Sequence, residues 1–138
     1  MQEQKKFISS IHPFNNLNTF ELEDLVEELD IVYFKANSIV QAQDSNPEFL
    51  YFVLKGLIQE INDDEVLSVY SKGEIFDSVS LIKNHSKNSF VAIEESICYA
   101  LKKERFMQIL SSNQQLENYF FQSISDKLNN NILNEKNK

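Results

Sequence analysis

The sequence contains very little cysteine, arginine and tryptophan. Its 138 residues include one cysteine, Cys98, a single arginine, Arg105, and no tryptophan. One cysteine excludes an internal disulfide and any zinc or iron–sulfur site that needs several thiolates. The sequence also lacks a run of 18 or more apolar residues, which a membrane-spanning helix would need. Since its first residues do not form the apolar core of a signal peptide, we expect a cytoplasmic location.

Positive charge is scarce as well. The 13 Lys and Arg residues are outnumbered by 21 Asp and Glu residues, which gives a formal net charge of −8. Nucleic acids and anionic membranes attract clustered basic residues, so we expect neither to be a direct partner.

The residues also do not favour catalysis: Glu74 and Asp77 form a carboxylate pair, but no nucleophile, metal set or phosphate-binding loop accompanies it. The sequence therefore predicts a protein that is not an enzyme.

Length and periodicity predict one domain made of three segments. Residues 1–29 have helical periodicity, and Asn18 with Glu21 forms a capping-box pattern that predicts one N-terminal helix. Residues 30–102 contain short β-branched and aromatic runs at a spacing of about ten residues, separated by turn residues. This pattern predicts an antiparallel sandwich or barrel. Residues 103–138 return to helical spacing and predict two C-terminal helices, with a break at Asn113.

The last predicted helix has a larger apolar surface than one buried face requires. Its stripe at helical spacing comprises Leu116, Tyr119, Phe120, Ile124, Leu128 and Ile132. Phe121 lies off this stripe. Two interpretations stay open, because the extra surface can pack against the barrel or against another molecule. We expect a homodimer formed through this C-terminal helix.

Four short motifs resemble landmarks of one known family. They are LYFVLKG at residues 50–56, GEIF at residues 73–76, FVA at residues 90–92 and CYALKKERF at residues 98–106. In order and spacing they resemble the cyclic-nucleotide-binding domain family of the catabolite-activator type, over residues 14–125. The resemblance implies a mainly β jelly roll with flanking helices. It further implies a regulatory module of a bacterial signal-transduction protein, with a cyclic nucleotide or a related small anion as the candidate ligand.

The resemblance also implies a binding cassette that begins at the second glycine. Glu74 takes the position of the family glutamate that accepts a hydrogen bond from the ribose 2′-hydroxyl. Asp77 stands where the family has a glycine. The arginine that usually pairs with the phosphate is missing, and Arg105 falls in the helix after the barrel, where it is expected to be a surface or helix-packing residue. The candidate ligand-binding residues are Gly73, Glu74, Ile75, Phe76, Ser78, Lys87 and Ser89.

The missing arginine sets the expected affinity. A charge-assisted hydrogen bond contributes about 1.5–3 kcal/mol, so its absence predicts weak or altered nucleotide binding. Lys87 is the best substitute cation, although a lysine lacks the planar fork of a guanidinium. Each feature has a structural alternative: Lys87 can belong to a solvated loop, and Glu74 can serve the turn alone. In that case the chain is a ligand-free dimerisation or scaffold module.

Overall fold

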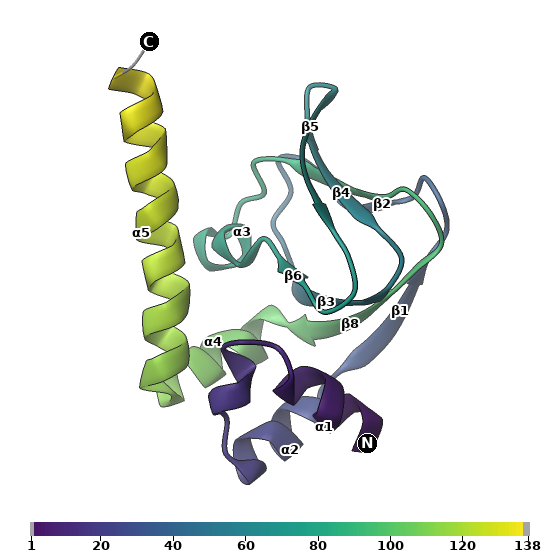
Figure 1. Ribbon diagram of the computed structural model, residues 1–138, viewed down its shortest axis with the longest axis vertical. Helices are drawn as coiled ribbons and strands as arrows, with labels where there is room; N and C mark the ends of the chain where they lie inside the picture. Colours follow the sequence, from purple (N-terminus) through teal and green to yellow (C-terminus); the bar gives the residue numbers. More distant parts are fainter. Residues whose placement is uncertain (1, 137–138) are drawn as a thin grey trace.

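A computed structural model describes the backbone of residues 2–136 and the side chains of residues 2–126. It contains a barrel of two four-stranded sheets, with helices gathered at one end and a long C-terminal helix beside it (Figure 1). The helices are α1 (Gln2–Ser9), the 3-10 helix η1 (Phe14–Asn16), α2 (Thr19–Glu27), α3 (Ser78–Lys83), α4 (Lys103–Ser112) and α5 (Gln114–Lys136).

All strand pairings in the two sheets are antiparallel. The first sheet has the order β1 (Asp30–Phe34), β8 (Ser96–Lys102), β3 (Phe49–Lys55) and β6 (Ile75–Phe76). The second sheet has the order β2 (Ile39–Gln41), β7 (Ser89–Ala92), β4 (Ile58–Asn62) and β5 (Glu65–Tyr70). The predicted jelly roll with flanking helices is confirmed.

Strand β3 explains why the sequence contains an unbroken apolar run. Side chains alternate between the two faces of a strand, so a run is continuous only where both faces are buried. Tyr51 and Val53 face the second sheet and join the core between the sheets. Leu50 and Phe52 point the other way and pack with the helices. The first sheet is therefore a middle layer between the second sheet and the helices.

The N-terminal segment contains two α-helices, where the sequence suggested one. Pro13 separates them, because proline cannot continue a helix and disfavours helical geometry in the residue before it. The second helix begins as expected: the Asn18 side chain accepts from the Glu21 amide at 2.8 Å, and Glu21 accepts from the Asn18 amide at 3.0 Å. The capping-box prediction is confirmed.

Helix α5 buries only part of its predicted stripe. Leu116 and Phe120 are fully buried against the other helices, whereas Tyr119 is 39% exposed. Phe121, off the stripe, is 46% exposed. Leu128 and Ile132, which the sequence placed on the same stripe, lie outside the described side chains.

Candidate functional site

Polar side chains from five parts of the chain meet on the inner side of the second sheet. We call this group the interior polar network, and it consists of Gln41, Glu60, Tyr70, Asp77, Ser86 and Asn88. Strands β2, β4 and β5 supply the first three, Asp77 precedes α3, and the last two lie in the loop between α3 and β7. Hydrogen bonds join all six, so the group is a connected structure.

Glu60 is the charged group at the centre of the interior polar network. Its side chain is only 7% exposed, because it shares the inward face of β4 with the buried Ile58. One carboxylate oxygen accepts from the Tyr70 hydroxyl at 2.8 Å, and the other accepts from Asn88 Nδ2 at 2.6 Å. Both donors are neutral, and Glu60 has no ion pair with a described side chain. The barrel interior therefore carries a negative charge held by neutral donors.

Gln41 connects the interior polar network to helix α3. Its Nε2 donates to Asp77 Oδ2 at 3.1 Å and to Ser86 Oγ at 2.8 Å. Asp77 has the left-handed backbone (φ 55°) that aspartate tolerates better than most residues. Its other carboxylate oxygen accepts from the Ser80 amide at 3.4 Å, as the N-cap of α3. A change in the barrel interior can therefore act directly on the start of α3.

Aromatic rings form the apolar side of the barrel interior. Phe76 stacks on Tyr51 and on Phe90, with ring centroids 5.5 Å and 5.0 Å apart, and Tyr70 lies against both phenylalanines. Burial and then the hydrogen bond to Glu60 raise the pKa of Tyr70 well above its ordinary value. Burial likewise raises the pKa of Tyr51 to about 12. Both phenols therefore stay protonated at neutral pH.

A cavity of about 190 Å³ opens beside Gln41 and Tyr51. It is lined by Val40, Gln41, Ala42, Ser45, Asn46, Pro47, Glu48, Phe49 and Tyr51. Glu48 is the charged residue of this lining, and no lysine, arginine or histidine belongs to it. The lining therefore offers amide and hydroxyl donors, but no cation that would pair with a phosphate.

The structure places Glu74 in a turn outside the interior polar network. Its carboxylate is exposed and accepts from the Ser71 amide at 2.9 Å and from the Ser71 hydroxyl at 3.1 Å. Gly73 beside it has φ 88°, where glycine is favoured, and a Cβ there would meet nothing within 4 Å. These contacts give Glu74 a part in closing the turn before β6.

The other predicted site residues are divided between the interior and the rim. Phe76 is buried beside the interior polar network. Ile75, which precedes Phe76 in the chain, and Ser78, which follows it by two positions, are half-buried. The Ser89 hydroxyl accepts from the Gln43 amide at 3.0 Å. Lys87 is exposed at the rim, where its backbone carbonyl accepts from Asn62 at 3.4 Å, and its ammonium has no ion pair with a described side chain.

Arg105 lies among the helices, away from the barrel interior. Its guanidinium donates to Gln108 at 3.0 Å and pairs with Asp24 at 3.7 Å. It lines a cavity of about 260 Å³ between α2 and α4. The expectation that Arg105 is a surface or helix-packing residue is confirmed, and the chain has no other arginine that could serve the barrel.

Most of the interior polar network was not predicted from the sequence, namely Gln41, Glu60, Tyr70, Ser86 and Asn88. One signal was available for Glu60, because it stands two residues after Ile58 in a strand and therefore shares its face. The loop residues gave no such signal, since their partners outside the loop are 26 or more positions away in sequence.

Two further classes of feature are absent from the described part of the chain. No group of three or more His, Cys, Asp or Glu side chains within it could hold a metal ion. None of its helices combines the length and apolar character needed to cross a bilayer.

Several solved structures have the same fold. The structure resembles the sensor domain of the transcriptional regulator DNR from Pseudomonas aeruginosa, with a TM-score of 0.79, 17% identity and coverage of 90% of this chain and 92% of that one. A putative cyclic nucleotide-binding protein from Geobacter metallireducens has a TM-score of 0.75 and 20% identity, with coverage of 88% of this chain and 92% of that one. The regulatory domain of Toxoplasma gondii PKA, solved with cAMP, has a TM-score of 0.72 and 18% identity, with coverage of 78% of this chain and 43% of that one.

Sequence comparison agrees with the structural one. A cGMP-dependent protein kinase from Eimeria tenella is 24% identical over 132 residues, which is 87% of this chain but only 13% of the kinase. The family model for the cyclic nucleotide-binding domain matches residues 31–113, from the first strand to the end of α4. The chain therefore belongs to the cyclic nucleotide-binding domain family, whose members are regulatory domains and not enzymes.

Proposed function

We propose that this chain is a sensor module of a bacterial, cytoplasmic signal-transduction protein, with weak or altered binding of cyclic nucleotides. The observation that carries the proposal is the interior polar network, which places the buried Glu60 carboxylate inside the barrel and connects to helix α3. The bacterial assignment is supported by two bacterial relatives, each covered over 92% of its length.

The charge of the barrel interior disfavours an anionic ligand. Glu60 is buried among neutral donors, and Glu48 lines the cavity beside Gln41. A cyclic phosphate entering this region would meet like charges where the effective dielectric constant is low, so repulsion is weakly screened. No arginine lies in the barrel to offset it, because Arg105 pairs with Asp24. Weak binding of cyclic nucleotides follows from this arrangement.

The route from ligand to output runs through Asp77. This residue accepts from Gln41 and also caps α3, and α3 packs beside α5 (Figure 1). A ligand that changes the Gln41 hydrogen bonds would alter the cap and favour one packing of α5 over another. Such a shift requires that the ligand bind the two arrangements with different affinity.

Calorimetric titration tests the sensor proposal. We expect cyclic AMP, cyclic GMP and cyclic dinucleotides to bind the chain with dissociation constants weaker than about 100 µM, given the lost charge-assisted bond. Glu60→Gln keeps the size of the side chain and removes its charge, so it should strengthen binding about tenfold. Glu65→Gln is the matched control, because this exposed glutamate begins β5 outside the network.

Two outcomes would contradict the proposal. Micromolar binding by the unaltered chain would show that the interior charge does not disfavour the ligand. If neither the unaltered chain nor Glu60→Gln gave a heat of binding with any of the nucleotides, the sensor function would be excluded. The ligand-free alternative would then be favoured. Lys87→Ala and Glu74→Ala, measured in parallel, decide whether the rim lysine and the turn glutamate contact ligand at all.

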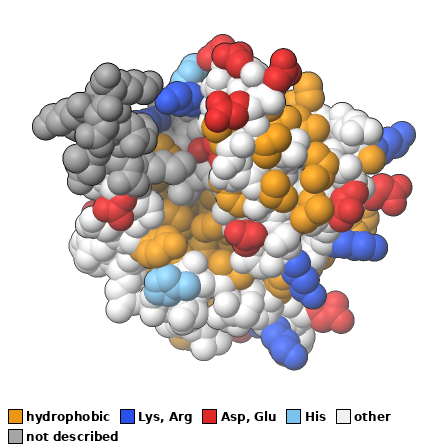
Figure 2. Space-filling view, turned by 45° about the horizontal axis from the view of Figure 1, so that its top comes forward, with side chains coloured by type: hydrophobic (Ala, Val, Ile, Leu, Met, Phe, Trp, Pro, Cys, Tyr) orange, Lys and Arg blue, Asp and Glu red, His pale blue; other side chains and the backbone are white. Residues whose placement is uncertain are grey.

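The alternative function is a dimerisation or scaffold module that uses α5. It is favoured by the exposure of Tyr119 and Phe121 on that helix, at 39% and 46%. Light scattering on the unaltered chain and on the Phe121→Glu variant tests this function. If both proteins were monomers, the dimerisation function would be excluded. Neither function involves nucleic acid or membrane, because the net charge of −8 opposes binding to both. On the face in Figure 2 the basic side chains are dispersed among acidic ones.

A further inference from the structure

Strand β1 is an unprotected edge of the first sheet. It pairs only with β8, through five consecutive residue pairs from Asp30↔Ala100 to Phe34↔Ser96, without a bulge. Among the described residues, no other backbone hydrogen bond involves residues 30–34. Edge strands usually carry lysine, proline or a bulge that blocks pairing with another chain. The sequence of β1, DIVYF, contains none of these.

The outward face of β1 is apolar and uncovered. Ile31 is 46% exposed and Tyr33 is 75% exposed, although both belong to the sheet face that the helices cover further along. There, Tyr99 of β8 is only 6% exposed and packs edge-on against Phe7 of α1, with ring centroids 5.7 Å apart. The helical layer thus ends before Tyr33, and the apolar face continues beyond it.

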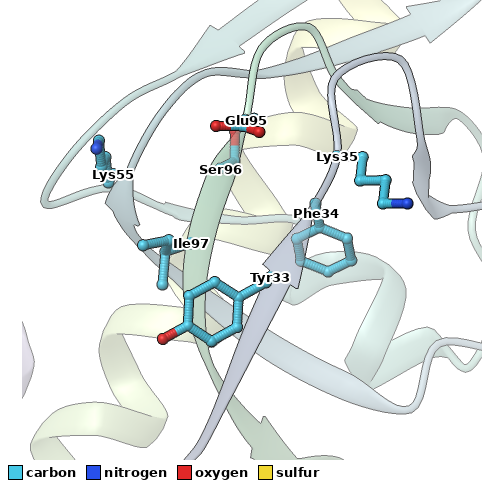
Figure 3. A pocket seen from close by; sticks show the side chains of 7 residues that line it. All are labelled: Tyr33, Phe34, Lys35, Lys55, Glu95, Ser96 and Ile97. Atoms are coloured by element: carbon cyan, nitrogen blue, oxygen red, sulfur yellow. The ribbon is translucent and has the colours of Figure 1, made fainter.

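A hollow of about 360 Å³ lies at this uncovered end, lined by Tyr33, Phe34, Lys35, Lys55, Glu95, Ser96 and Ile97. Figure 3 shows Tyr33 and Ile97 in the middle, with Lys35 and Lys55 on opposite sides. Neither lysine has a carboxylate partner within 4 Å among the described side chains. Two lysines and one glutamate leave the rim with a net positive charge, in a protein whose total charge is −8.

Charge changes sign along β1. Glu27, Glu28 and Asp30 lie exposed just before or at its start, whereas Lys35 is exposed directly after its end. In an antiparallel pair, the start of one strand lies beside the end of the other. Two copies of β1 paired in this way would therefore place acidic residues beside the lysines at both ends.

We propose that a second copy of this chain pairs with β1, edge to edge and antiparallel, to make one sheet across two molecules. A two-fold axis at Val32 puts Ile31 of each copy opposite Tyr33 of the other. Opposed residues share a sheet face, and an aromatic residue against a β-branched one is a favourable cross-strand pair. The same register places Lys35 opposite Leu29 of the second copy, between the exposed Glu28 and Asp30.

Two effects limit the strength of this dimer. A five-residue strand pair with its flanks is a small interface, below the size of most permanent ones. The charge of −8 on each copy also opposes association, although salt at about 0.15 M screens charges beyond about 8 Å. We therefore expect a dimer that dissociates on dilution.

Sedimentation or light scattering over a range of concentrations, in 0.15 M salt, tests the proposal on the whole chain. The mass should rise from 16.1 kDa toward twice that value as concentration increases. Ile31→Lys should weaken dimerisation at least tenfold. Val69→Lys is the matched control, because Val69 is equally exposed, at 46%, and lies on β5, the edge strand of the other sheet.

Charge reversal tests the register without disturbing the core. Lys35→Glu should weaken the dimer about threefold to tenfold, because it places a glutamate between Glu28 and Asp30 of the second copy, and adding Asp30→Lys should recover part of that loss. In a Val32→Cys variant, a disulfide across the two-fold axis should form under mild oxidation, because opposed strand residues lie within disulfide range.

The outcomes separate this surface from the α5 surface proposed for the scaffold. A monomer at all concentrations overturns the β1 proposal. So does a dimer that Phe121→Glu abolishes while Ile31→Lys and Lys35→Glu leave it unchanged. Ligand titration is read independently, so failure of the sensor function does not decide this inference.

Discussion

Glu60 places a carboxylate inside the barrel. Buried carboxylates are normally paired with a cation or fully hydrogen-bonded, because desolvation of the charge is costly. Here Tyr70 and Asn88 satisfy both oxygens, so the charge can remain inside the barrel without a lysine or arginine. The consequence is chemical: the interior favours hydrogen-bond donors and repels anions. The proposed weakness of cyclic nucleotide binding depends on this residue more than on any other.

Cys98 gives a prediction about pH. It is fully buried between the sheets, and burial raises the pKa of its thiol from 9.0 to about 12. Above pH 9 the unfolded chain therefore loses this proton before the folded chain does. Stability should fall as pH rises from about 9 to 12, with a slope of about 1.4 kcal/mol per pH unit from this residue. Below pH 9 the contribution is fully present.

Urea unfolding between pH 8 and 10 measures this slope. We expect Cys98→Ala to be less stable at pH 8 but to show a flatter decline, since alanine has no proton to lose. Tyr51, whose pKa is also raised to about 12, should titrate in the unfolded chain only from pH 10 upward. Parallel declines for both proteins between pH 9 and 10 would contradict the burial argument.

At the scale of elements, the start of α2 is defined by two reciprocal hydrogen bonds. Asn18→Ala removes the acceptor for the Glu21 amide, and should lower the free energy of unfolding by about 1 kcal/mol. Asn16→Ala serves as the control, because Asn16 is exposed at the end of η1 and no side-chain hydrogen bond fixes it. Chemical denaturation monitored by circular dichroism measures both, and equal losses would show that the cap contributes nothing specific.

The alternation of side chains along a strand also explains which parts of the site could be predicted from the sequence. In the middle of β3 and β8 both faces are buried, so consecutive apolar residues identify the strands but not the direction each side chain faces. In β4 the pattern is Ile58, Gln59, Glu60, and only the pairing with β7 fixes Glu60 on the inner face beside Phe90. The carboxylate was visible in the sequence, while its burial depended on register.

At the scale of the whole molecule, the helices share a core with one face of the first sheet. Phe52 of β3 contacts Phe14 of η1, with ring centroids 5.1 Å apart, and Phe14 also meets Phe120 of α5. Leu101 of β8 belongs to the same buried cluster. The N-terminal helices, α5 and this face of the first sheet therefore bury one another, while the other face of the first sheet belongs to the core between the two sheets.

We therefore expect a single unfolding transition. Far-UV circular dichroism, which reports the helices, and near-UV signals from the tyrosines should give the same midpoint. Phe52→Ala should lower stability by about 3–5 kcal/mol and keep both midpoints coincident. Val69→Ala, on the exposed outer face of the second sheet, should change stability by less than about 0.5 kcal/mol. Separate midpoints for helices and strands would contradict the shared core.

The sequence by itself determined the succession of a helical segment, a β barrel and two helices, the capped start of α2, the break before α5 and the lack of an arginine for phosphate. These features depend on periodicity, local capping and composition, which act between near neighbours in the chain. Tertiary structure alone decided that Gln41, Glu60, Asp77 and Asn88 meet, and that Glu74 remains in a turn. Their contacts depend on strand register and on how two sheets close around one interior, and neither is encoded at short range.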